Sequence, residues 1–203
     1  MIKDIFNLFV STDKLRPAML SPFEINGKIY ATNATVLIRC DKSHCDFEIT
    51  NTEKAPDCER VIPAPNMDVV LNIDRSIFDT YKTEDEWVEI ECDTCDGEGQ
   101  VEWEFQNYTE DFDCPVCKGD GIKSKHKTGN KIFRDVGVKL NNSYINIPLF
   151  YKLIQIRDML EEDIHLIYQE NPTNPVLFKV GFCEILLMPY MHNYDNKEVW
   201  NYL

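Results

Sequence analysis

The chain has 203 residues, 43% of them hydrophobic, and a formal net charge of −14. This length allows one full domain or two small ones with a buried core. The negative charge argues against non-specific adhesion to nucleic acid or an anionic membrane, although a local patch can differ from the sum. The amino-terminal apolar run is short and interrupted by charges, and no segment approaches the roughly 20 apolar residues of a membrane span. We therefore expect a soluble, cytoplasmic protein.

The amino-terminal third predicts a helix followed by strands. Residues 2–10 carry apolar side chains at helical spacing, namely Ile2, Ile5, Phe6 and Phe9. Asn26-Gly27 is a strong hairpin signal, and strands are expected over 28–33 and 34–40. Residues 50–68 are rich in Pro, Asn, Asp and Thr, which predicts a long loop.

The remaining elements indicate an α+β fold with mostly antiparallel pairing. A short helix is expected after Asp74, its candidate N-cap, and residues 86–92 alternate like a half-buried strand. Asn141-Asn142 marks a hairpin turn, and Pro148 occupies the first turn of a longer helix. Three short strands are expected over 163–169, 176–181 and 184–190. The polar, aromatic tail after residue 190 is expected to pack back or fray.

The motif C-x-x-C-x-G-x-G occurs twice, at residues 92–99 and 114–121. The resulting array, C-x2-C-x18-C-x2-C, has the spacing of a tetrahedral zinc site. The candidate ligands are Cys92, Cys95, Cys114 and Cys117. Four thiolates leave no position for a reactive water, so we expect one structural Zn²⁺. The alternative is a pair of redox dithiols, which the dense neighbouring carboxylates disfavour.

These residues resemble the cysteine-rich region of DnaJ-type co-chaperones, which repeats the same motif. The resemblance covers residues 92–121 and implies half of that region, a zinc-binding β-hairpin knuckle with one site. The chain lacks the His-Pro-Asp signature of a J-domain, so chaperone activity does not follow. An alternative function is nevertheless a protein-interaction or chaperone-like module that binds peptides. Its platform would be the nearby aromatic residues Trp103, Phe105, Tyr108 and Phe112.

The segments 25–40, 145–156 and 163–191 resemble the sliding clamp of bacteria, the DNA polymerase III beta subunit. The resemblance implies a clamp-like body of β-α-β-β-β units over residues 1–90 and 126–203. The zinc-knuckle module, residues 91–125, would be inserted into that body. Where the family has Gly-His-Arg, this chain has Ala34-Thr35-Val36, so an Arg facing DNA is missing there. Clamps also hold client peptides in an apolar pocket, and its counterparts here would be Leu187, Met188, Pro189 and Met191. The alternative for these four residues is an ordinary edge-strand core.

Charge is distributed in blocks, with thirteen acidic residues and no Lys or Arg over 84–113. A basic block follows the second cysteine pair, and we expect it to form a loop. Its cations are Lys118, Lys123, Lys125, Lys127, Lys131 and Arg134. They are candidates for contacting nucleic-acid phosphates, and the alternatives are solubility or pairing with the acidic block.

The sequence shows no catalytic constellation that rises above chance. The four histidines lack metal-protease spacing, and no phosphate-binding loop or nucleophile elbow is present. We therefore expect a non-enzymatic accessory protein that binds zinc together with DNA or a replication partner. The competing hypotheses are the peptide-binding module described above and a thiol oxidoreductase.

Overall fold

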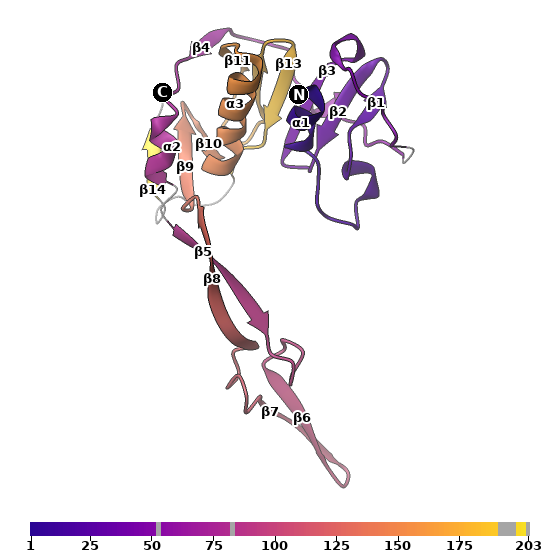
Figure 1. Cartoon of the computed structure of the whole chain (residues 1–203), viewed down its shortest axis with the longest axis vertical. Coiled ribbons are helices and arrows are strands. Elements are labelled where there is room, and N and C mark those ends of the chain that lie inside the picture. The colour runs from indigo at the N-terminus through magenta and orange to yellow at the C-terminus, as the bar shows by residue number, and fades with distance from the viewer. Residues whose placement is uncertain (52–53, 82–83, 191–197, 202–203) are drawn as a thin grey trace. The chain divides into compact units, whose positions relative to one another are not determined.

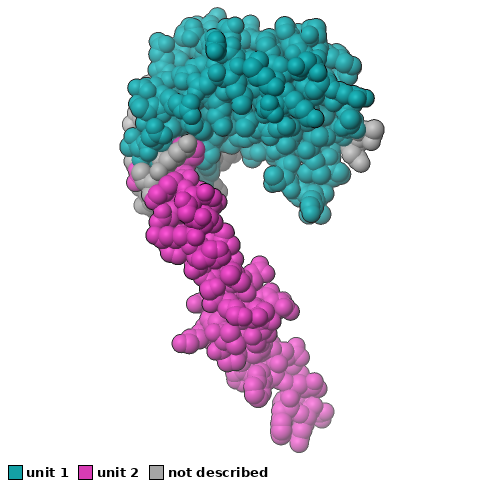
Figure 2. Space-filling view, in the orientation of Figure 1, with its two compact units in different colours: residues 1–81, 135–203 teal, residues 82–134 magenta. Residues whose placement is uncertain are grey.

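The computed structural model describes residues 1–51, 54–81, 84–190 and 198–201, the last four by their backbone alone. The chain divides into two compact units, which Figure 2 colours separately. Unit 1 comprises residues 1–81 and 135–203, and unit 2 comprises residues 82–134. The predicted insertion, 91–125, falls inside unit 2, because the strands that flank the four cysteines pair with each other. No helix among the described residues is both long and apolar enough to cross a bilayer.

Unit 1 is built on a seven-stranded antiparallel sheet of order β1-β2-β3-β13-β12-β11-β4 (Figure 1). Its strands are β1 (Phe23–Ile25), β2 (Lys28–Thr32), β3 (Val36–Asp41), β4 (Val69–Leu71), β11 (Ile164–Tyr168), β12 (Val176–Val180) and β13 (Cys183–Leu187). The hairpin at Asn26-Gly27 and the three late strands are confirmed, whereas β4 was not predicted. Pairing of β3 with β13 joins the two ends of the chain into one sheet.

A smaller sheet and three α-helices complete unit 1. The sheet has the order β10-β9-β14, with β9 (Val136–Leu140), β10 (Ser143–Asn146) and β14 (Glu198–Asn201), and β14 runs parallel to β9. The α-helices are α1 (Ile2–Asn7), α2 (Ser76–Tyr81) and α3 (Ile147–Leu160), and three short 3-10 turns are η1 (Pro17–Met19), η2 (Lys42–His44) and η3 (Glu59–Val61). The run β10-α3-β11-β12-β13 has the expected β-α-β-β-β order. Residues 1–81 instead have the order α1-β1-β2-β3-β4-α2 in their described part, which is not a β-α-β-β-β unit.

Side-chain alternation gives the large sheet two differently covered faces. One cross-strand row, Ala31, Ile38, Ile185 and Phe178, is fully buried. Helix α3 covers this face, since its Phe150 meets Phe178 edge to face at 6.3 Å between ring centroids. The adjacent row, Thr32, Leu37, Leu186 and Leu177, points to the opposite face. There it packs with Phe23, Tyr30, Cys58 and Ile167 in a second apolar cluster.

Unit 2 consists of two antiparallel ribbons joined through the cysteine motifs. We call β5 (Glu84–Glu91) with β8 (Ile122–Ile132) the charge-paired ribbon, and β6 (Gln100–Phe105) with β7 (Tyr108–Asp113) the aromatic ribbon. The expectation of a half-buried strand at β5 is wrong, because Trp87, Val88 and Ile90 are 53, 41 and 45% exposed. The expected basic loop is also wrong, since it forms the long strand β8. Neither ribbon pairs with another described strand, so neither belongs to a larger sheet.

Candidate functional site

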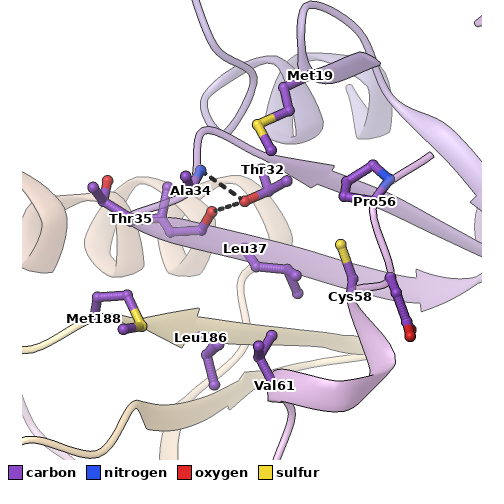
Figure 3. Close-up of a pocket in the computed structure, with 12 residues that line it drawn as sticks. Met19, Thr32, Ala34, Thr35, Leu37, Pro56, Cys58, Val61, Leu186 and Met188 are labelled. Carbon is purple, nitrogen blue, oxygen red and sulfur yellow. Dashed lines mark hydrogen bonds between the residues drawn. The ribbon is translucent and has the colours of Figure 1, made fainter. Parts of the chain in front are cut away.

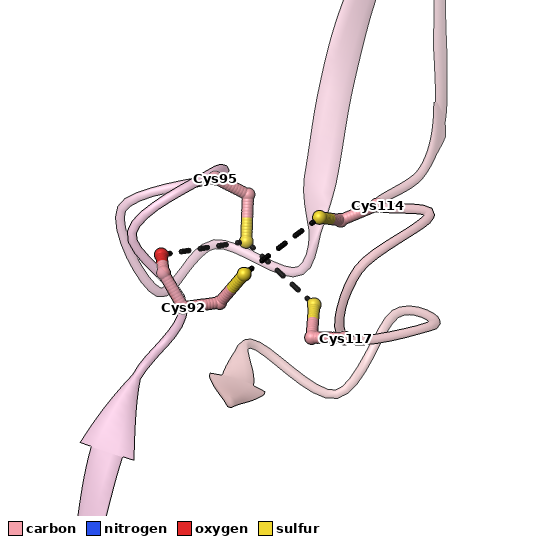
Figure 4. A group of neighbouring side chains, drawn as sticks. All are labelled: Cys92, Cys95, Cys114 and Cys117. Carbon is pink, nitrogen blue, oxygen red and sulfur yellow. Dashed lines mark hydrogen bonds between the residues drawn. The ribbon is translucent and has the colours of Figure 1, made fainter. Parts of the chain in front are cut away.

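The four cysteines of the repeated motif form one buried cluster in unit 2 (Figure 4). Cys92 and Cys95 lie in the turn after β5, and Cys114 and Cys117 lie in the turn after β7. The Sγ atoms are 3.8 Å apart between Cys92 and Cys114 and 3.7 Å apart between Cys95 and Cys117, and all four lie within 4.8 Å of one another. Each side chain is at most 7% exposed. The cluster could therefore hold a metal ion.

The two turns hold each other in reciprocal fashion. The backbone N–H of Cys92 donates to the carbonyl of Gly121 at 2.8 Å, and that of Cys114 donates to the carbonyl of Gly99 at 2.7 Å. Each of these glycines also donates its N–H to a sulfur, Gly99 to Cys95 and Gly121 to Cys117, both at 3.3 Å. Backbone donors thus already point at two of the four sulfurs, as in sites where thiolate charge is softened by hydrogen bonds.

Gly99 and Gly121 are required where the two turns cross. Their φ angles are +79° and +70°, a region that side-chain-bearing residues rarely adopt. A Cβ on Gly99 would lie 2.3 Å from the carbonyl oxygen of Gly119, and one on Gly121 would lie 2.2 Å from that of Gly97. Substitution at either position would therefore push the turns apart and spread the sulfurs.

The possible donors of the cluster are four cysteine sulfurs. Backbone N–H groups of Cys117 and Val116 lower the pKa of the Cys114 thiol to about 7, whereas burial raises the pKa of Cys95 to about 12. Four adjacent thiolates can form together only if a cation balances their charge. All eight cysteines are free thiols, and the sulfurs of the four in the cluster lie close enough together to share one ion.

An apolar pocket of about 220 Å³ lies on the second face of the large sheet in unit 1 (Figure 3). Its floor includes Leu37 and Leu186, neighbours in the cross-strand row described above. Further lining comes from η1, the β2–β3 turn, the loop around η3 and the residue after β13, namely Met19, Thr32, Ala34, Thr35, Val36, Pro56, Asp57, Cys58, Val61 and Met188. Val61 and Met188 are 51 and 39% exposed and form part of the mouth.

Ion pairs at the partly exposed Arg39 fix the segment that carries one wall of this pocket. Arg39 on β3 contacts Glu59 at 2.8 Å and Glu184 at 2.6 Å, and Tyr30 donates its hydroxyl to Glu59. The Tyr30 hydrogen bond and the Arg39 guanidinium hold the pKa of Glu59 below its usual range. Glu59 therefore stays charged and tethers the η3 segment, which carries Cys58 and Val61, to the sheet.

The sequence predicted this pocket only in part. Met188 lines it as expected, but Leu187 is buried on the opposite face of β13, because side chains alternate along a strand. Pro189 is buried and does not line the pocket, and Met191 lies outside the described residues. Leu186, Leu37 and Cys58 were missed. Strict alternation from Met188 would have identified Leu186.

Most of the basic residues proposed for nucleic-acid contact face carboxylates of β5 or of the first cysteine turn. Lys123 contacts Asp93 at 2.8 Å and Lys125 contacts Glu89 at 2.5 Å. Lys127 and Lys131 both contact Asp85 at 2.5 Å. These pairs correspond to the predicted alternative of pairing with the acidic block. Lys118 is exposed in the second cysteine turn and Arg134 is half-buried at the end of unit 2. Nucleic-acid binding by these residues stays a prediction.

No protein-family model and no curated protein matches the chain. The solved structures that are similar to it include bacterial sliding clamps. The DNA polymerase sliding clamp of Bacillus subtilis is 12% identical with a TM-score of 0.48, and the match covers 94% of this chain and 62% of that chain. The DNA polymerase III beta subunit of Borrelia burgdorferi is 15% identical with a TM-score of 0.47, covering 94% and 60%. The chain thus spans less than two thirds of the length of either clamp.

Proposed function

We propose that unit 1 is a non-enzymatic protein-interaction module whose apolar pocket binds a short segment of a DNA-replication protein. The pocket carries the proposal. Its volume of about 220 Å³ is below the roughly 300 Å³ at which small-molecule sites begin, so it suits a few anchoring side chains better than a cofactor. Apolar residues in such hollows supply most of the binding energy of many peptide complexes.

The class of partner comes from the sequence resemblance to sliding clamps. Clamps hold client peptides in an apolar pocket, and the resembling segments 25–40 and 163–191 contribute most of the lining residues here. The β2–β3 turn and the end of β13, which carry that resemblance, meet at the pocket, where the Met188 N–H donates to the Thr35 carbonyl at 3.0 Å. We infer a clamp-like body that recruits a replication partner.

The test measures binding of short fluorescent peptides that carry two adjacent apolar residues, by fluorescence anisotropy. Met188→Glu places a charge at the mouth of the pocket and should weaken binding by about tenfold or more. Val70→Glu is the matched control, since Val70 is a 46% exposed apolar residue of β4 that does not line the pocket. Equal affinity of the two variants, or no binding by any peptide of the panel, would refute the proposal.

We further infer that the four-cysteine cluster holds one Zn²⁺ through Cys92, Cys95, Cys114 and Cys117. The closed set of sulfur donors favours a structural ion that stabilises the fold over one that activates water. The test is metal analysis of protein purified without added zinc, paired with titration of accessible thiols. About one equivalent of zinc and protection of four thiols are expected. A different metal, or freely titratable cluster thiols, would contradict the assignment.

Contact between DNA and the basic strand β8 is a second proposal. The ion pairs of β8 oppose it, because they already occupy its lysines. A phosphate would have to replace Asp93, Glu89 or Asp85 at the corresponding lysine. Binding of single- and double-stranded DNA at low salt, lost when Lys123, Lys125 and Lys127 are changed to Ala, would favour it. Absence of binding by the unmodified protein at low salt would exclude it.

A further inference from the structure

The aromatic ribbon has two chemically different faces. Its register pairs Val101 with Phe112, Trp103 with Glu110, and Phe105 with Tyr108. Because side chains alternate along a strand, these six lie on one face. The other face carries the polar and acidic residues Gln100, Glu102, Glu104, Thr109, Asp111 and Asp113. One face is thus a platform of rings with a single carboxylate at its centre.

The rings of this platform are largely exposed. Trp103, Phe105, Tyr108 and Phe112 are 66, 74, 77 and 49% exposed. Trp103 and Phe112 meet edge to face at 6.5 Å and help to line a hollow of about 340 Å³ together with Asp113 and Pro115. Large apolar residues gathered on one exposed face indicate an interaction site.

The charge of the ribbon restricts what can bind it. Residues 100–113 contain five carboxylates and no Lys, Arg or His. None of the five forms an ion pair with a described residue, whereas Asp85 and Glu89 of the charge-paired ribbon and Asp93 of the first cysteine turn all do. An unneutralised acidic surface repels nucleic acid and anionic lipid and attracts cationic segments.

The tryptophans of the two ribbons have cross-strand partners of opposite charge. In the former, Trp87 pairs across the strands with Lys127, whose Nζ lies 5.2 Å from the centroid of the ring. In the latter, the equivalent partner of Trp103 is Glu110. One tryptophan therefore has a cation from its own chain, and the other has a carboxylate that can attract a cation from another chain.

We propose that the aromatic ribbon is a docking surface for a basic segment of a partner protein, with a Lys or Arg side chain seated over Trp103 and paired with Glu110. The aliphatic stem of the cation would pack on the rings of Trp103 and Phe112. Its charged group would gain both a cation–π contact and an ion pair. This site lies in unit 2 and does not depend on the apolar pocket of unit 1.

The experiment uses the whole 203-residue chain, purified with zinc present, and a short fluorescent peptide of alternating Arg and Leu residues. A peptide with Glu in place of Arg and a single-stranded DNA oligonucleotide are the comparison probes. The Arg-Leu peptide should bind at low salt and weaken as salt is raised. Trp103→Ala should reduce its affinity by about five- to tenfold. Trp87→Ala, which removes an exposed tryptophan from the other ribbon, should leave the affinity unchanged.

A charge-matched pair distinguishes the site from general attraction to an acidic protein. Glu110→Gln and Glu102→Gln each remove one negative charge, from the aromatic and the polar face respectively. Loss of a negative charge should lower the affinity for the Arg-Leu peptide slightly in both variants, and Glu110→Gln should lower it more than Glu102→Gln does. Equal effects of the two, insensitivity to Trp103→Ala, or absence of binding would overturn the proposal. DNA binding or self-association that Trp103→Ala abolishes would overturn it too, since the occupant would then be nucleic acid or a second copy.

Discussion

The two ribbons of unit 2 are built from similar alternating sequences but differ in whether basic side chains neutralise their acidic ones. In the charge-paired ribbon an acidic strand lies against a basic one, and Asp85 and Glu89 each contact a lysine. In the aromatic ribbon both strands are acidic, and no described residue neutralises them. The first ribbon neutralises part of its own acidic charge, which suits a structural arm. The second exposes both its rings and its charges, which suits recognition.

The largest expected effect comes from removing a cysteine ligand. Cys92→Ser should abolish metal binding, whose free energy in four-thiolate sites is on the order of 10 kcal/mol. The aromatic ribbon should lose order first, because an isolated two-stranded hairpin is marginal in water and its Val101 packs on the cluster. Hydrogen exchange should therefore accelerate more over 100–113 than over 84–91.

Cys45→Ser is the control for this experiment, since Cys45 is a half-buried thiol of unit 1 outside the cluster. It should retain the metal and the exchange pattern of the unmodified protein. Retention of a full equivalent of zinc by Cys92→Ser would contradict the four-ligand site.

A smaller effect is expected from glycine substitutions that differ only in their surroundings. Gly99→Ala combines a positive φ with a collision against the Gly119 carbonyl and should destabilise the cluster by about 3 kcal/mol or more. Gly129→Ala, in β8, has a similar φ of +87° but no atom within 4 Å of the added Cβ, so it should cost only about 1 kcal/mol. Chelator competition would compare the metal affinity of the two variants, and unfolding measurements would compare their stability. Equal destabilisation would refute the interpretation that Gly99 is required where the two cysteine turns cross.

Giving the aromatic ribbon the cation–tryptophan pair of the charge-paired ribbon should stabilise it modestly. Glu110→Lys gives Trp103 the cross-strand cation that Trp87 already has, and should stabilise the aromatic ribbon by about 0.5–1 kcal/mol while blocking the Arg-Leu peptide. Amide exchange over 100–105 would report the stability. Glu102→Lys makes the same charge change on the polar face and should not protect these amides to the same extent.

The smallest expected effect is a pH dependence confined to the charge-paired ribbon. Hydrogen bonds and charge attraction from Lys127 and Lys131 lower the pKa of Asp85 from 3.8 to about 2. A lowered pKa in the folded state means that the stabilisation is complete above pH 3.8 and is lost as the pH falls toward 2. The loss should be small, because Asp85 is solvated. Carboxyl NMR titration would measure it, and a midpoint near 3.8 would contradict the paired geometry.

Much of unit 1 could be predicted from the sequence because its signals are local. Asn26-Gly27 and Asn141 supply the positive φ values that tight hairpins need, and Pro148 lies in the first turn of α3. Strand β4 was missed because three residues, Val69–Leu71, carry too little alternation to be recognised. The burial of β5 was mispredicted because alternation reports which residues share a face, not whether anything covers that face.

The candidate sites differ in the same way, since one rests on a local sequence motif and the others rest on contacts between distant segments. The cysteine cluster could be predicted from the motif spacing. Each C-x-x-C turn places two sulfurs together, and a chain that brings the two turns into contact brings all four together. The apolar pocket required the cross-strand register that places Leu37 beside Leu186, which are far apart in the sequence. The partners of Lys123, Lys125 and Lys127 likewise depend on how β5 and β8 are aligned. Such non-local contacts are not encoded in any short segment.

The pairing of Glu84 with Ile132 has a consequence for how this protein could have arisen. The chain enters and leaves unit 2 at neighbouring points, and the seven-stranded sheet takes all its strands from unit 1. Gain or loss of the whole segment would leave the order of strands in the sheet intact. Unit 2 therefore has the properties of an insertion that could carry its cysteine cluster and its aromatic ribbon into another fold without a change in the strand order of either part.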